Sequence, residues 1–144
     1  MNRFATLVLA LTLVTSALAG CSGSGHSPSE SSSDAISITG ISPTAGGKLA
    51  PGSTVTFTAN VSYQLSSAAT GTIVLSLEDQ LSNPLQTGTQ PSVTVNQGQG
   101  TTSLTDHLTI PASGVTQIQV FVSLTPAGAA FTNTVALVTY PVGT

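Results

Sequence analysis

Residues 54–63 read Thr-Val-Thr-Phe-Thr-Ala-Asn-Val-Ser-Tyr, and this stretch decides the fold class. Its apolar residues occupy every second position, and polar residues fill the positions between them. Because successive side chains of a β-strand point to opposite faces, the pattern predicts a strand with one buried and one solvent-facing side. Phe57 lies in the middle of the apolar series, so we expect it in the core of the domain.

Short alternating runs interrupted by Gly and Pro recur along the chain from Ala35 onward. No segment after the N-terminal region shows a sustained helical period. Such runs are typical of an all-β, antiparallel two-layer sandwich. About seven strands are expected, at residues 36–39, 54–63, 72–77, 92–95, 101–110, 116–124 and 131–140.

Most of these runs also predict which side chains point inward. In the run 131–140 both sides are partly apolar, and the pattern does not assign its inward face. In the runs 54–63, 72–77, 101–110 and 116–124 the expected inward residues are Val55, Phe57, Ala59, Val61, Tyr63, Ile73, Leu75, Leu77, Leu104, Leu108, Ile110, Ile118, Val120, Val122 and Leu124.

The N-terminal segment has the form of an export signal. Arg3 supplies a positive charge, and residues 4–19 are apolar or small. This stretch is shorter than the roughly 20 residues that span a bilayer as a helix, and a Gly/Ser segment ends it abruptly. A cleaved signal peptide over residues 1–20 is therefore favoured over an uncleaved anchor.

Leu18-Ala19-Gly20-Cys21 resembles the lipobox of bacterial lipoproteins, and Cys21 is the only cysteine of the chain. The resemblance implies cleavage before Cys21, attachment of a diacylglycerol to its sulfur, and acylation of its amine. With no second cysteine, an internal disulfide is excluded. Ser22 lacks the aspartate associated with inner-membrane retention in enteric bacteria. We therefore expect a membrane-anchored lipoprotein of the cell envelope, in the outer membrane if the host has one.

Residues 21–34 are expected to form a flexible linker between the lipidated cysteine and a domain at 35–144. Apart from Pro28, residues 22–34 carry no apolar side chain, so burial cannot offset the entropy of ordering them. His26 lies alone in this segment and is interpreted as linker.

Charged residues are scarce, at 5% of the chain against about 25% in ordinary soluble domains. After the signal segment the only base is Lys48, against five acids. Nucleic acids and anionic phospholipid surfaces are bound through clustered Lys and Arg, so this composition argues against both as partners. The expected membrane contact is the N-terminal lipid alone.

Three stretches resemble bacterial immunoglobulin-like and fibronectin type III-like domains. They are Pro-Gly-Ser-Thr-Val-Thr-Phe at 51–57, Gln-Gly-Gln-Gly-Thr-Thr at 97–102 and Ile-Gln-Val-Phe-Val-Ser-Leu at 118–124. The resemblance covers residues 35–142 and implies an immunoglobulin-like sandwich that acts as a spacer, an adhesive module or a carbohydrate-binding unit. The core tryptophan and cysteine pair of many such domains are absent, which leaves the named family open.

The titratable residues do not predict catalysis, a cofactor or a metal site. Asp106 and His107 are adjacent, but neighbours on a strand point to opposite faces. His107 shares its phase with flanking threonines and is expected to face solvent. Glu78 and Asp79, even with Asp106, are too few for calcium, which takes six to eight oxygen ligands. We expect a solvated strand end there and a protein that is not an enzyme.

Asp106 is unusual because it shares the inward phase of Leu104 and Leu108. A buried, unpaired carboxylate is very costly. The residue must therefore lie at the sheet margin or in a bulge, pair with Lys48 or backbone amides, or have a functional role.

Two functions fit these features. The first is a lipid-anchored, non-enzymatic envelope module for binding, adhesion or spacing, with a protein or carbohydrate partner that the sequence does not identify. The second is an assembly subunit that pairs with a partner protein through an exposed sheet edge. Natural edges are guarded by Lys, Pro or bulges. Lys48 is expected to guard the first strand, whereas residues 91–97 and 131–140 carry no charge.

Overall fold

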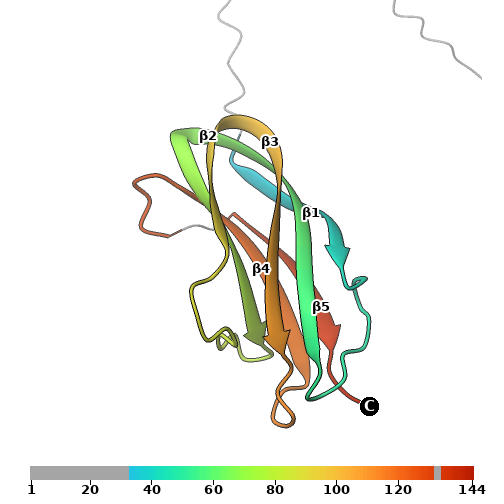
Figure 1. Cartoon of the computed structure of the whole chain (residues 1–144). Helices are drawn as coiled ribbons and strands as arrows, with labels where there is room; N and C mark the ends of the chain where they lie inside the picture. Colours follow the sequence, from blue (N-terminus) through green and yellow to red (C-terminus); the bar gives the residue numbers. More distant parts are fainter. Residues whose placement is uncertain (1–32, 132–133) are drawn as a thin grey trace, which may run out of the picture. The chain divides into compact units, whose positions relative to one another are not determined.

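The structure, a computed structural model, describes residues 33–131 and 134–144. These residues form one curled sheet of antiparallel strands and contain no helix, which confirms the all-β prediction (Figure 1). Hydrogen-bonded neighbours follow the order β1-β2-β4-β5, and β3 also pairs with β2. The strands are β1 (Ala35–Ser42), β2 (Thr54–Asp79), β3 (Ser92–Thr109), β4 (Gln117–Pro126) and β5 (Val135–Pro141).

The described residues contain five strands rather than seven, because two expected pairs are each one continuous strand. β2 has 26 residues and covers the runs at 54–63 and 72–77. β3 has 18 residues and covers the runs at 92–95 and 101–110. Both exceed the usual strand length of about 3–10 residues. Figure 1 shows that both turn over at the same end of the domain.

The turn-over of β2 is a large bulge opposite β3. Leu65 pairs with Gly98 and Thr70 with Asn96, so residues 66–69 of β2 face Gln97 alone. The Gln97 side-chain amide donates a hydrogen bond of 2.9 Å to the carbonyl oxygen of a residue in the bulge, Ser66. A stretch without large apolar side chains, which looks like a connection in the sequence, therefore continues the strand.

β3 changes its inward phase at the same place. Val95 is buried at an odd position, whereas Leu104 and Leu108 are buried at even positions. Gly98, between them, has a φ of 113°, a conformation that glycine adopts without steric cost. The phase change explains why the sequence pattern divides this strand in two.

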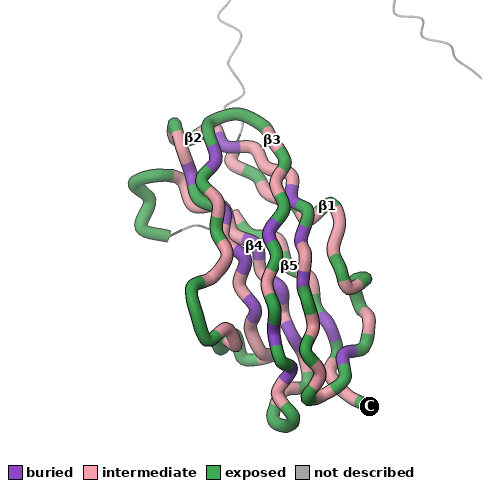
Figure 2. Tube along the Cα trace, in the orientation of Figure 1, coloured by how far each residue is buried: buried purple, intermediate pink, exposed green. Residues whose placement is uncertain are grey.

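Buried residues recur at odd positions of β2 both before and after its bend, and Figure 2 shows this alternation of buried and more exposed residues along the strand. Its first half, 54–65, lies between β1 and β3, and its second half, 70–79, lies next to β3 and β4. Because the same side faces inward before and after the bend, the sheet curls around a single core. The buried residues of β2 are Phe57, Ala59, Val61, Leu65, Gly71, Ile73, Leu75 and Leu77.

A contact between Phe57 and Tyr140 joins distant parts of the curled sheet. Their ring centroids lie 5.5 Å apart with the planes at 70°, which is the favourable edge-to-face arrangement. Both side chains are fully buried, and the Tyr140 hydroxyl donates a hydrogen bond of 2.6 Å to the Pro43 carbonyl oxygen. Burial also raises the pKa of Tyr140. The first half of β2 and the C-terminal strand therefore share the centre of the core.

The inward residues expected from the sequence pattern are buried, except Val55 and Tyr63, which are half-buried and pack against the core. In the C-terminal run, which the pattern left unassigned, Tyr140 is buried while Val135 and Leu137 are each 48% exposed. The strand also begins at Val135 rather than at 131, and Phe131 lies outside it with 79% of its surface exposed.

We predict that Phe57→Ala lowers the free energy of unfolding by about 3–5 kcal/mol, because it opens a cavity against Tyr140. Chemical denaturation measured by circular dichroism tests this. Phe131→Ala removes the same ring from an exposed site and is expected to change stability by less than about 0.5 kcal/mol. Equal effects of the two substitutions would contradict the assigned core.

Candidate functional site

The expected lipidation site, Cys21, lies outside the described residues, as do the signal segment, the lipobox and the expected linker up to residue 32. Within the described ranges no helix is long and apolar enough to cross a membrane.

Asp34, expected as the last residue of the linker, is hydrogen-bonded into the domain. Its Oδ1 accepts hydrogen bonds from the backbone N–H groups of Ser66 (2.7 Å) and Ser67 (3.0 Å), and the Ser67 hydroxyl donates to Oδ2. Both serines lie in the bulge of β2. These bonds, with that from the Ser67 hydroxyl foremost, lower the pKa of Asp34. The residue directly before β1 is therefore bound to the bulge of β2, and this carboxylate holds the bend.

Asp106 lies on the inward phase of β3, directly opposite Phe57 and half-buried. Its Oδ2 accepts a hydrogen bond of 2.5 Å from Gln86 Nε2, and its Oδ1 accepts one of 2.7 Å from the backbone N–H of His107. Pairing with a backbone amide is confirmed. The expectation of a bulge at Asp106 is wrong, because the β2–β3 ladder is regular around this residue. The expectation of an ion pair with Lys48 is also wrong, because Lys48 donates a hydrogen bond to the main-chain oxygen of Thr144.

Gln86, which sequence reasoning missed, is the main partner of Asp106. Its Nε2 also donates to the Leu75 carbonyl oxygen at 3.2 Å, and its Oε1 accepts from the Leu77 N–H at 2.9 Å. The Gln86 side chain thus forms hydrogen bonds both with the backbone of the second half of β2 and with the carboxylate of Asp106 on β3. Nothing in the local sequence marks this glutamine, because its partners come from two other segments.

Asp106 also lines a depression of about 400 Å³, which is bounded by the loop 85–89 and residues 106–109. The carboxylate therefore lies at the margin of the core, where β3 has β2 as its only strand partner among the described residues.

His107 is exposed, as expected, and Nδ1 lies 2.8 Å from the Thr56 hydroxyl. It belongs to a row of polar cross-strand pairs on the outer side of β2 and β3. Thr54 and Thr58 pair in the same way with Thr109 and Thr105, each at 3.0 Å between hydroxyl oxygens. Asp106 and His107 bind different partners, so their side chains form no acid–base pair.

Asp79 organises the turn that follows β2. Its Oδ1 accepts from the N–H groups of Leu81 (2.8 Å) and Asn83 (2.9 Å), and its Oδ2 accepts from Asn83 Nδ2 (2.9 Å). The Asn83 side chain is the first cause of its lowered pKa. Burial, and secondarily the charge of Asp79, raises the pKa of Glu78. Asp79 is the last residue of β2, as the expectation of a strand end requires, and its carboxylate is bound within the turn that follows.

The acids expected to be too few for a metal site are not brought together. Residues 33–131 and 134–144 contain no group of three His, Cys, Asp or Glu side chains placed to hold a metal ion.

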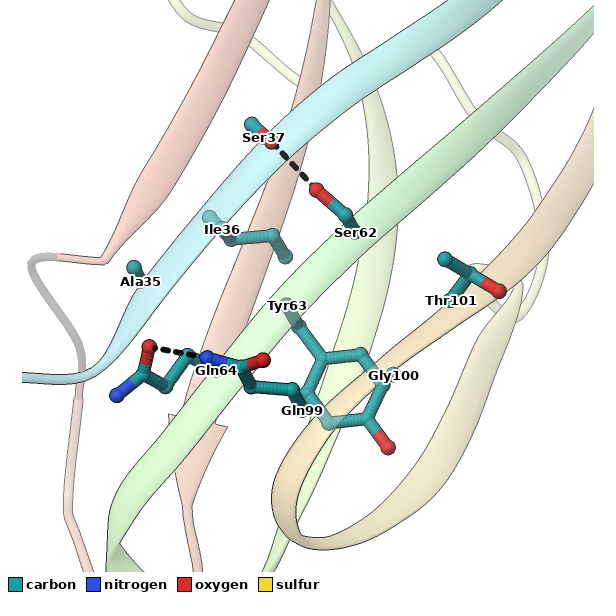
Figure 3. A pocket seen from close by; sticks show the side chains of 9 residues that line it. All are labelled: Ala35, Ile36, Ser37, Ser62, Tyr63, Gln64, Gln99, Gly100 and Thr101. Carbon is teal, nitrogen blue, oxygen red and sulfur yellow. Dashed lines mark hydrogen bonds between the residues drawn. The ribbon is translucent and has the colours of Figure 1, made fainter.

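A second depression, of about 530 Å³, crosses β1, β2 and β3 (Figure 3). Ile36, Tyr63 and Gly100 form its central row in the strand register. A Cβ at Gly100 would lie only 2.6 Å from the Tyr63 hydroxyl oxygen, so the tyrosine occupies the space that a side chain would fill. The nine lining residues are Ala35, Ile36, Ser37, Ser62, Tyr63, Gln64, Gln99, Gly100 and Thr101.

The lining of this depression is uncharged. The amides of Gln64 and Gln99 are joined by a hydrogen bond of 3.1 Å, and the hydroxyls of Ser37 and Ser62 by one of 2.7 Å. One aromatic ring, two amides and several hydroxyls suit a neutral polar ligand better than an ion.

No protein-family model matches this chain, and no curated protein sequence matches it.

We predict that Asp34→Asn destabilises the domain at neutral pH but not in strong acid. The folded state lowers this pKa, so the ionised carboxylate stabilises the fold above its unfolded pKa, near 3.8, and the stabilisation is lost as pH falls through the folded pKa. Melting temperatures from pH 7 to pH 2 are expected to differ most above about pH 5 and to converge in acid.

Glu78→Gln is the control of opposite sign. Because the folded state raises the pKa of Glu78, its ionisation opposes folding, and the substitution should not lower the melting temperature at neutral pH. A difference between Asp34→Asn and the unaltered protein that stays constant down to pH 2 would contradict the proposed role of the Asp34 charge.

We predict that Asp106→Asn lowers stability by about 1–3 kcal/mol, because an amide N–H₂ would face the Gln86 amide, which its other partners hold in place. Calcium is expected to leave the melting temperature of both proteins unchanged. Isothermal titration provides the second measurement. Micromolar calcium binding that disappears in Asp106→Asn would instead assign a calcium site to this margin.

Proposed function

We propose that this protein is a lipid-anchored protein of the cell envelope whose β domain acts as a binding, adhesive or spacer module and not as an enzyme. The observation that carries the proposal is that the aspartate carboxylates of the described domain form structural hydrogen bonds. Asp34, Asp79 and Asp106 each accept hydrogen bonds from backbone amides at a bend, a turn or a strand margin. Carboxylates bound in this way stabilise local structure, and the His107 ring contacts the Thr56 hydroxyl instead of any of these three carboxylates.

The anchor rests on the match of Leu18-Ala19-Gly20-Cys21 to a lipobox after a signal-like segment. One acyl chain holds a protein only marginally, whereas two or three chains on Cys21 would make attachment stable. A flexible linker of this length has a root-mean-square reach of roughly 20 Å. A domain attached in this way needs no membrane-binding surface of its own.

We further propose that the curled sheet is a variant of the immunoglobulin-like two-layer sandwich. The bend divides β2 and β3 so that each contributes a segment to both layers, and the seven expected runs then correspond to five continuous strands. The edge-to-face contact between Phe57 and Tyr140 supports this arrangement, because it packs the first half of β2 against β5.

The proposed ligand surface is the uncharged depression around Tyr63. Its amides and hydroxyls can exchange hydrogen bonds with a protein backbone or a carbohydrate, and its ring can contact the apolar side of either. On the outer side of the same strand, which also carries Ser62 and Gln64, the polar pairs of Thr54 and Thr58 add further neutral hydrogen-bonding groups.

We predict that Cys21→Ala moves the protein out of the membrane fraction or leaves it as uncleaved precursor, because the acceptor of the lipid is lost. Fractionation of cells followed by intact-mass spectrometry measures both outcomes. Ser24→Ala, three residues away, is the matched control and should leave membrane attachment unchanged. An unmodified Cys21 on membrane-bound protein would show that the anchor is assigned wrongly.

A further inference from the structure

We propose that the free edge of β5 pairs with β5 of a second copy of this chain, forming one sheet across two domains. This deepens the second function considered from the sequence, edge-mediated assembly, by naming the partner. Membrane attachment follows from the proposed anchor, but pairing depends only on the described domain.

The backbone of β5 offers an open edge on the side away from β4. Leu124 N donates to the Thr134 carbonyl oxygen, and Leu49 N donates to the Pro141 carbonyl oxygen from the opposite side. Hydrogen-bonded pairs alternate along an antiparallel ladder, so even-numbered residues of β5 face β4 and odd-numbered residues face outward. The N–H and C=O groups of Val135, Leu137 and Thr139 therefore point to the free side. β1 approaches β5 but pairs with β2. No backbone group of the described residues forms a hydrogen bond with the outward N–H and C=O groups of Val135, Leu137 and Thr139.

The features that guard natural edges gather at one end of this strand. Pro141 lacks an N–H, its carbonyl oxygen is occupied by Leu49, and Lys48 donates to Thr144 close by. From Val135 to Thr139 there is no charge, no proline and no register shift. An edge of this kind is a template for a further strand.

The side chains favour this edge over the other uncharged one. Val135 and Leu137 are each 48% exposed, and Leu137 lies opposite Phe121 of β4. Within the uncharged run 91–97 the exposed residues of β3 are polar (Ser92, Thr94, Asn96 and Gln97), and those of β1, the third edge strand, are Ala35, Ser37, Thr39 and Ser42. Among the three edge strands only β5 has exposed large apolar side chains, so added strand contacts would bury such surface only there.

The register of β5 is self-complementary, which is why we assign the partner as a second copy. A two-fold axis at Leu137 pairs it with its own counterpart and pairs Val135 with Thr139 of the other chain. All three residues have outward backbone groups, so this register forms three doubly hydrogen-bonded pairs. A shift by one residue would place outward groups opposite inward ones and form none, and a shift by two residues would leave two. The cross-strand pair of Phe121 and Leu137 then lies next to the same pair of the second copy. No charge on β4 or β5 opposes this contact.

The test is co-purification of two differently tagged full-length copies from detergent-solubilised membranes after crosslinking. The unaltered copies should co-purify. Leu137→Lys in both copies places like charges directly opposite each other and should reduce recovery about tenfold or more. Co-expressing one Leu137→Lys copy with one Leu137→Glu copy should restore it, because opposite charges then meet at the axis. Thr94→Lys, on the uncharged edge of β3, is the control and should pair normally.

Failure of the unaltered copies to co-purify overturns the proposal, as does normal pairing of Leu137→Lys copies. Capture of a different protein in place of the second copy also overturns it. The membrane and soluble fractions of the same cells are assayed separately, so loss of the anchor appears as a change of fraction, and loss of self-pairing appears as a change of recovery.

Discussion

The bend of β2 is the constraint on which the rest of the structure depends. A straight strand of 26 residues would carry its apolar side well past any single layer of core. The bulge at 66–69 turns the strand while keeping odd positions inward, so its two halves cover the same core. Asp34 and Gln97 bind this bulge from two other segments. The contact between Phe57 and Tyr140 exists because the sheet is curled in this way.

The domain contains very few charged residues, and neutral polar side chains form most of the side-chain hydrogen bonds that connect its strands. Hydroxyl pairs connect β2 to β1 and β3 across their outer sides, and Gln86 occupies both backbone groups and a carboxylate. The described aspartates are bound to nearby amides. A surface built from such groups offers neutral hydrogen bonds rather than ionic contacts, which agrees with the proposal that a lipid, and not electrostatics, holds the protein at the membrane.

Edge pairing and lipid anchoring would reinforce each other. Attachment to one membrane raises the effective concentration of copies, so that a contact too weak in dilute solution can be populated. The linker proposed from the sequence would let two domains rotate until their β5 strands run antiparallel. The guarded end at Pro141 would then limit the added pairing to the central residues of the strand.

The all-β class and the inward residues of most strands can be predicted from the sequence alone, because the alternation in residues 54–63 and 118–124 follows from backbone geometry within each strand. The Cys21 motif is equally local and remains a prediction. Only the tertiary structure decided that residues 66–69 and 97–100 continue strands, since a turn and a bulge look alike until the partner strand is present. Likewise, the Asp106 carboxylate is bound by Gln86, and the Asp34 carboxylate is bound by a bulge more than thirty residues away. The contact between Tyr140 and Phe57 determines which face of β5 points inward. Each of these depends on segments far apart in the chain, and no local pattern records which distant segments will meet.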